Sequence, residues 1–76
     1  MQQLERITID PEVMGGRPCV RGHRLTVGII VGLIAAKHTR EEVLAMYPFL
    51  EDEDITQALQ YAAWSASEHE VPIRRA

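Results

Sequence analysis

The chain has 76 residues, of which 46% are hydrophobic, and a net charge of −3 at pH 7. This length gives one domain and leaves no room for a second. The single cysteine excludes an internal disulfide, no Cys/His spacing resembles a zinc site, and the acidic balance argues against general affinity for nucleic acid, because phosphate contacts rest on Lys and Arg.

Neither the start of the chain nor its most apolar run resembles a targeting or membrane signal. Residues 1–6 are polar and lack the apolar core of a signal peptide. The longest apolar run, residues 27–36, is much shorter than the roughly 20 residues that cross a bilayer. We therefore expect a cytoplasmic protein.

The N-terminal third is predicted to hold a short strand and a basic loop. Residues 7–10 alternate apolar and polar side chains, which predicts a strand, and Asp10-Pro11 ends it with turn chemistry. Residues 15–24 (GGRPCVRGHR) then gather three arginines and three glycines. This composition predicts a loop of defined shape that presents a local positive patch on an acidic body.

A helix is predicted over residues 27–37, with Thr26 as its N-cap, and it is apolar on more than one face. One stripe at helical spacing consists of Val27, Ile30, Val31 and Ile34. Ile29 and Leu33 lie off that stripe. A domain of this size can hardly cover both faces, so we expect a homodimer. Its predicted interface residues are Ile7, Ile9, Ile29 and Leu33.

Two further helices are predicted in the C-terminal half. Thr39 and Glu42 form a capping box for a helix that ends before Pro48. Residues 48–51 form a tight connection whose apolar residues, Phe49 and Leu50, are expected in the core. The third helix covers residues 52–67. Its predicted inward stripe is Ile55, Leu59, Ala62, Ala63 and Ala66, and its predicted outward residues are Gln57, Gln60, Trp64 and Glu68.

The third helix begins with four acidic residues, 51–54, which suit the positive end of a helix dipole and are expected to be solvated. After it the chain loses its helical periodicity. We expect one domain over residues 1–70 and a flexible tail over residues 71–76.

No catalytic or metal-binding residues are predicted. The histidines at positions 23, 38 and 69 are separated in sequence, and Cys19 has no activating neighbour and is expected to be a half-buried hydrophobe. Nothing assembles a nucleophile, a base and an orienting group. The sequence therefore indicates a non-enzyme without cofactors.

The helix order predicts a mainly α-helical, helix-turn-helix (winged-helix-like) core of three helices with a short N-terminal β element. In this layout the third helix could enter the major groove of DNA. The predicted phosphate contacts are Arg17, Arg21, Arg24, Lys37 and Arg40. The predicted base contacts are Gln57 and Gln60, because amide side chains can pair with adenine. The acids at residues 51–54 repel phosphate and oppose this use of the helix.

Residues 7–63 resemble the small bacterial family catalogued as domain of unknown function 433 (DUF433). The resemblance rests on ITIDP at residues 7–11, GGRPCVRGHR at 15–24, TREEVL at 39–44, YP at 47–48, and DI, AL and YAA between residues 54 and 63. It implies a helix-turn-helix fold and a role as antitoxin of a type II toxin–antitoxin pair. Such antitoxins commonly dimerise, bind their own operator and mask a PIN-like ribonuclease toxin.

The implied toxin suggests a use for the tail. PIN-like nucleases gather carboxylates, and an arginine presented to them would form a strong pair when desolvated. The predicted toxin-binding residues are Ile73, Arg74 and Arg75. The alternative for the tail is an ordinary frayed end. The alternative for the whole chain is a protein-interaction or dimerisation module that never meets DNA.

Overall fold

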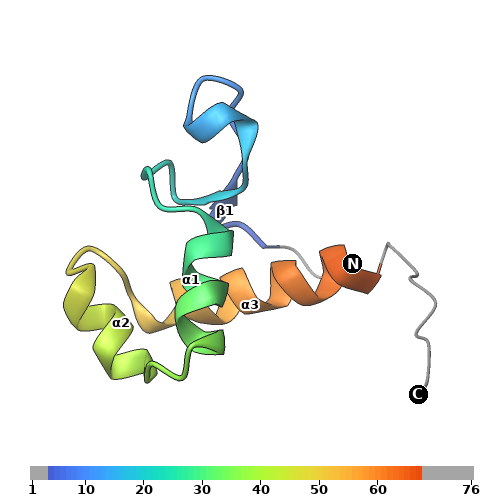
Figure 1. The fold of residues 1–76 in the computed structure, drawn as a ribbon. Helices are drawn as coiled ribbons and strands as arrows, with labels where there is room; N and C mark the ends of the chain where they lie inside the picture. The colour runs from blue at the N-terminus through green and yellow to red at the C-terminus, as the bar shows by residue number, and fades with distance from the viewer. Residues whose placement is uncertain (1–3, 68–76) are drawn as a thin grey trace, which may run out of the picture.

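The computed structural model describes residues 4–67, which form three α-helices and a two-stranded sheet (Figure 1). In chain order the elements are β1 (Ile7–Thr8), the 3-10 turn η1 (Met14–Gly16), β2 (Cys19–Val20), α1 (Val27–Ala35), α2 (Arg40–Met46) and α3 (Asp52–Ser67). The mainly helical class with a short N-terminal β element is as predicted. None of the helices within the described range has the length and apolar character needed to span a membrane.

The sheet is antiparallel, with Ile7 opposite Val20 and Thr8 opposite Cys19. Both residues of β2 are buried, and Cys19, predicted to be half-buried, is only 2% exposed. The backbone of Cys19 also forms an isolated antiparallel β-bridge with Thr26, the residue directly before α1. The small sheet therefore anchors the N-terminal end of that helix.

The first strand is shorter than predicted. Its ladder stops at Thr8, and Ile9 is 59% exposed. Asp10 instead forms a turn, because its carboxylate accepts a hydrogen bond from the Glu12 backbone N–H at 2.9 Å and its carbonyl accepts one from Val13 at 2.9 Å. Aspartate favours such local bonds over a ladder, and here they redirect the backbone.

Helix α1 begins where predicted and ends two residues early. The Thr26 hydroxyl caps it by accepting a hydrogen bond from the Ile29 N–H at 3.1 Å. At the other end Lys37 adopts a positive φ of 74°. The Lys37 N–H bonds the Ile34 carbonyl and the next N–H, of residue 38, bonds the Leu33 carbonyl, which is the bonding pattern of a Schellman motif. The helix therefore stops at Ala35, before the predicted residue 37.

Helix α2 has the predicted capping box with both bonds formed: Glu42 N–H to the Thr39 hydroxyl at 3.0 Å, and Thr39 N–H to the Glu42 carboxylate at 2.8 Å. It ends at Met46. In the connection to α3, Leu50 is buried as predicted. Phe49 is 39% exposed, so the expectation that both residues fill the core was wrong for Phe49.

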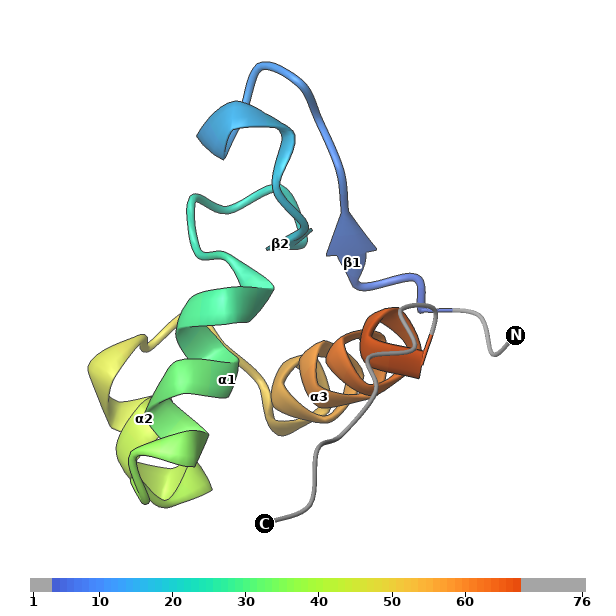
Figure 2. The same ribbon diagram turned by 45° about the vertical axis from the view of Figure 1, so that its right-hand side comes forward.

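The core lies where α1 packs across α3, with α2 beside the C-terminal end of α1 and the sheet beyond its N-terminal end (Figures 1 and 2). Its buried apolar members come from every layer and are Val20, Leu25, Val27, Ile30, Val43, Leu50, Ile55 and Ala58.

The burial of α3 differs from the predicted stripe. Ile55 is fully buried, but Ala63 and Ala66 are exposed. Gln57, predicted to face outward, is 7% exposed, and Asp54, predicted to be solvated, is 0% exposed. The reason is that β1 and its flanking residues cover the first half of α3 and supply hydrogen-bond donors to it.

Candidate functional site

Asp54, in the first turn of α3, is a fully buried carboxylate that joins three parts of the chain. Its Oδ1 accepts hydrogen bonds from Arg6 Nη1 and Arg21 Nε, both at 3.0 Å. Its Oδ2 accepts from Arg21 Nη2 at 2.9 Å and from the Glu51 backbone N–H at 2.8 Å. We call Arg6, Arg21, Glu51 and Asp54 the Asp54 cluster.

Ion pairs between the two arginines and the two carboxylates hold the Asp54 cluster together. Burial alone raises the pKa of Asp54, but the hydrogen bonds from Arg21, from the Glu51 backbone and from Arg6 outweigh it and lower the pKa below its ordinary value. Asp54 is therefore ionised at neutral pH. The hydrogen bonds that Arg6 donates to Glu51 and Asp54 raise the pKa of Arg6, and those that Arg21 donates to Asp54 raise the pKa of Arg21.

Arg21 is directed inward by its loop. It has a positive φ of 44°, followed by Gly22 at 76°, and the His23 N–H closes the turn onto the Val20 carbonyl at 2.8 Å. A positive φ is uncommon for a residue with a side chain. The bidentate bond to Asp54 and a further bond from Arg21 Nη2 to the Phe49 carbonyl at 2.7 Å stabilise this conformation.

Two other residues of the predicted DNA surface are also bonded within the domain. Arg40 donates to the Asp52 carboxylate at 2.8 Å, the Asp52 carbonyl at 2.9 Å and the Thr56 hydroxyl at 2.7 Å. Buried Gln57 accepts from the Arg6 backbone N–H at 2.9 Å and donates to Glu53 at 3.3 Å. Together with Arg21, these residues link elements of the fold to one another.

The remaining members of the predicted DNA surface are not gathered in one place. Arg17, Arg24 and Lys37 are exposed, and within residues 4–67 none of them has a hydrogen-bonded side chain or an ion pair. Arg17 and Arg24 precede the N-terminal end of α1, whereas Lys37 follows its C-terminal end. Gln60 is half-buried on α3.

The predicted dimer residues divide into two kinds. Ile9 and Ile29 are 59% and 41% exposed. Ile7 and Leu33 are half-buried and pack against the core. The predicted toxin-binding residues Ile73, Arg74 and Arg75 lie outside the described residues.

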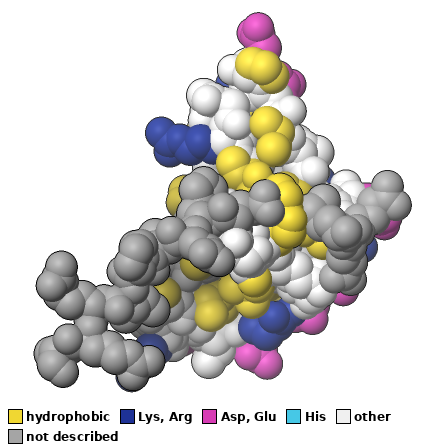
Figure 3. All heavy atoms as spheres, turned by 90° about the vertical axis from the view of Figure 1, so that its right-hand side faces the viewer, with side chains coloured by type: hydrophobic (Ala, Val, Ile, Leu, Met, Phe, Trp, Pro, Cys, Tyr) yellow, Lys and Arg dark blue, Asp and Glu magenta, His cyan; other side chains and the backbone are white. Residues whose placement is uncertain are grey.

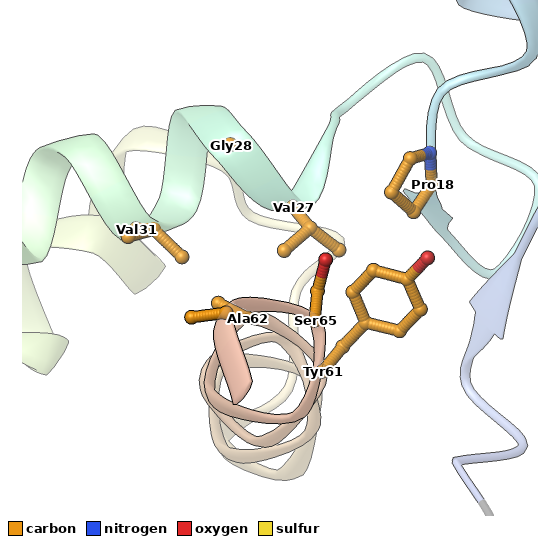
Figure 4. Close-up of a pocket in the computed structure, with 8 residues that line it drawn as sticks. Pro18, Val27, Gly28, Val31, Tyr61, Ala62 and Ser65 are labelled. Atoms are coloured by element: carbon orange, nitrogen blue, oxygen red, sulfur yellow. The ribbon is translucent and has the colours of Figure 1, made fainter. Parts of the chain in front are cut away.

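An apolar groove, which we call the α1/α3 groove, runs between these two helices (Figure 4). Its volume is about 370 Å³, and its lining is Pro18, Val27, Gly28, Val31, Tyr61, Ala62, Ser65 and Ala66. A second hollow of about 400 Å³ is lined by Arg17, Pro18, Thr26, Gly28 and Ile29. The two hollows share Pro18 and Gly28 in their linings, so they adjoin each other, and we call the pair the depression beside α1.

The surroundings of the groove carry little charge. Helix α1 contains no charged residue from Val27 to Ala35. On α3, the part beyond Asp54 contains no charged residue as far as Ser67. Figure 3 shows hydrophobic side chains gathered down the middle of one face of the molecule, with Lys, Arg, Asp and Glu at its margins. Such a surface suits contact with another protein more than contact with phosphate.

The groove and Asp54 were both missed from the sequence, for different reasons. Asp54 precedes Ala58 by one helical turn and shares its face, so helical periodicity could have placed it inward despite its charge. The groove depends on the crossing of α1 over α3 and on the absence of a side chain at Gly28, which no local pattern reveals.

The two histidines within residues 4–67 have different neighbours, and His69 lies outside the described residues. His23 stacks on Phe49 with ring centroids 4.1 Å apart, and His38 lies 3.5 Å from the Glu42 carboxylate. Among residues 4–67 no three His, Cys, Asp or Glu side chains are grouped so that they could hold a metal ion.

Comparison with known proteins places the chain in a family. The family model described as "Protein of unknown function (DUF433)" matches residues 7–62. The chain is similar to "Uncharacterized protein y4eO" of Sinorhizobium fredii (strain NBRC 101917 / NGR234), with 40% identity over 58 residues. That match covers 76% of this chain but only 26% of the relative.

A solved structure has the same fold. The crystal structure of a DUF433 member from Anabaena variabilis ATCC 29413 superposes with a TM-score of 0.78 at 32% identity, covering 83% of this chain and 62% of that one. The chain thus spans about a quarter of the curated relative and less than two thirds of the solved one. From the family model, the sequence identity and the shared fold, the chain belongs to the DUF433 family.

Proposed function

We propose that this chain is the antitoxin of a type II toxin–antitoxin pair and that it acts by binding a PIN-like ribonuclease. The role itself comes from the family resemblance. The observation in favour of protein binding is the α1/α3 groove with the exposed Ile29 beside it. Exposed apolar surfaces of this kind commonly mark sites where another protein binds.

The internal bonding of the basic residues also favours protein binding over broad DNA contact. Arg21, Arg40 and Gln57 serve the fold itself. Helix α3, the predicted reading helix, begins with exposed Asp52 and Glu53 and has no basic residue up to Ser67. Insertion of this helix into a major groove would bring carboxylates towards phosphates.

The direct test is neutralisation. The chain is mixed in increasing ratio with the PIN-like ribonuclease that this proposal expects to be encoded beside its gene, and cleavage of an RNA substrate is followed. We expect cleavage to fall to background near one equivalent and the two proteins to elute together in size-exclusion chromatography. Unchanged cleavage at a tenfold excess of the chain would contradict the proposal.

Operator binding is the second candidate, favoured by the exposed and unbonded state of Arg17, Arg24 and Lys37 within the described residues. A mobility shift on the DNA upstream of the gene should weaken with salt. Arg24→Ala should flatten the salt dependence by about one unit if Arg24 contacts one phosphate. If no specific shift occurs at low salt, the chain is an interaction module that does not bind DNA.

A further inference from the structure

We infer that the α1/α3 groove and the adjoining hollow hold an apolar segment of a partner protein that carries a carboxylate at its Arg17 end. This inference deepens the proposed function and rests on it for the identity of the partner. It adds the chemistry that the bound segment must have. That chemistry follows from the shape of the depression, from its lining and from the charge at one end.

The shape comes from a missing side chain. Gly28 lines both hollows, and a Cβ built on it would meet only the Thr26 hydroxyl, at 3.8 Å. Val27 and Val31 form the α1 wall, and Ala62 lies opposite them on α3 (Figure 4). Small and apolar walls of this kind accept aliphatic side chains of a segment laid along the groove.

One end of the depression is aromatic and basic. The hydroxyl of Tyr61 points towards Pro18, which lines the α1/α3 groove at this end (Figure 4). Beyond Pro18, the second hollow is lined by Arg17, which is exposed and has no ion pair within residues 4–67. An apolar groove that adjoins one guanidinium without an ion pair in the described part of the chain selects a segment whose aliphatic residues have an acid at one end.

The same charge disfavours the other occupants. A second copy that presented its own α1 would bring no carboxylate to Arg17, because α1 has no charged residue. The apolar stretch of this chain at residues 71–73 lies between Glu70 on one side and Arg74 and Arg75 on the other, so only one of its two directions avoids like charges beside Arg17. Nucleic acid offers phosphate to Arg17 but has no aliphatic side chains for the groove walls.

The test selects peptides from a random library displayed on phage, with the parent chain as bait. We expect enriched peptides to contain aliphatic residues with Asp or Glu at one end of them. A synthetic copy of an enriched peptide is then titrated by NMR. The amide signals of Gly28, Val31 and Ala62 should shift, and replacing the peptide's acid by its amide should weaken binding about fivefold at low salt.

Variants connect the peptide to the site. Gly28→Gln places a side chain in both hollows and should weaken peptide binding at least about tenfold. Gly32→Gln is the matched control, because Gly32 is exposed one turn later on α1 and lines neither hollow. It should leave binding within about twofold. Arg17→Ala should remove the preference for the acid over the amide.

The following outcomes would overturn the inference. They are an absence of enriched peptides, enrichment of basic or acid-free peptides, and equal binding of the peptide by the parent chain and by Gly28→Gln.

Other results would assign the groove to another occupant. If Gly28→Gln turns a parent dimer into a monomer in sedimentation, a second copy fills the groove. If peptides bind only after residues 71–76 are removed, the chain's own end fills it. A DNA oligonucleotide that shifts the same amides in place of peptides would assign the site to nucleic acid.

The inference and the proposed function fail separately. Neutralisation of the ribonuclease with no peptide selectivity at the groove would leave the antitoxin role and reject this site. Selective peptide binding without neutralisation would leave the site and reject the PIN-like partner.

Discussion

The two halves of α3 show opposite relations between polarity and burial. The first half contains Asp54 and Gln57, which are 0% and 7% exposed. The second half has mostly apolar or small side chains, yet Trp64 is 37% exposed and Ala63 and Ala66 lie open. The buried polar residues of α3 thus lie in its first half, and its exposed apolar residues lie in its second half.

The difference shows that burial in this fold follows the available partners more than residue type. A buried polar group is tolerated only when its hydrogen bonds are made. Arg6 and Arg21 supply these bonds to Asp54, and no buried side-chain nitrogen or oxygen of the described residues lacks a partner. The second half of α3 lines the α1/α3 groove, so part of its apolar surface remains available for binding.

The largest effect is expected from Asp54→Ala. It leaves the guanidinium groups of Arg6 and Arg21 and the Glu51 backbone N–H without their shared acceptor. Losing these charge-assisted hydrogen bonds to a buried carboxylate should cost about 1.5–3 kcal/mol, since Arg6 and Arg21 keep access to solvent, and this is still a large share of the stability of a domain of this size. Urea denaturation followed by circular dichroism measures it. The control is Asp52→Ala, because Asp52 lies in the same turn of α3 as Asp54 and forms an exposed ion pair with Arg40. Its replacement should change stability far less.

Acid should weaken the same half of α3 in a graded way. The pKa of Asp54 is lowered in the folded state, from an unfolded value of about 3.9. Its contribution is therefore complete above the unfolded pKa and is lost as pH falls through the folded pKa. Urea midpoints between pH 7 and pH 3 should fall, and less steeply in Asp54→Asn. The remaining slope should include Glu42 and Asp52, whose pKa values are also lowered. Equal slopes in both proteins would place the acid sensitivity elsewhere.

The third expected effect concerns association and leaves the fold intact. Ile29 is 41% exposed, so Ile29→Glu should leave the urea midpoint nearly unchanged at a protein concentration where the parent chain is monomeric. It should weaken the predicted homodimer at least about tenfold in sedimentation. Leu33→Glu is the contrast, because Leu33 packs against the core and its replacement should lower the stability of the monomer. A parent chain that is monomeric at micromolar concentration would reject the predicted dimer.

The sequence predicted the elements well because their ends carry local chemical signals. The capping box at Thr39 and Glu42 fixed the start of α2, and Thr26 fixed the start of α1. The early end of α1 was missed because the residue in the left-handed conformation after a helix is usually glycine, and here it is Lys37.

The site was less predictable because it depends on contacts between distant residues. The arginines of the loop were recognised as unusual, but whether each one faces solvent depends on Asp54, which is 33 residues from Arg21. The same long-range pairing decides why Arg17 is available and Arg21 is not. Spacing along a chain does not reveal which of several arginines finds the buried acid.

The smallest expected effect separates the two glycines of α1. Glycine within a helix costs about 0.5–1 kcal/mol relative to alanine. A Cβ at Gly32 would meet nothing within 4 Å, and one at Gly28 would make only an ordinary contact. Both Gly32→Ala and Gly28→Ala should therefore raise the free energy of unfolding by about that amount. Only Gly28→Ala adds a methyl group to the lining of the α1/α3 groove, so it alone should also reduce affinity for a groove-binding peptide. Peptide affinity and urea midpoints are measured for both variants. Equal peptide affinity would mean that Gly28 only lowers the stability of the helix and has no part in binding.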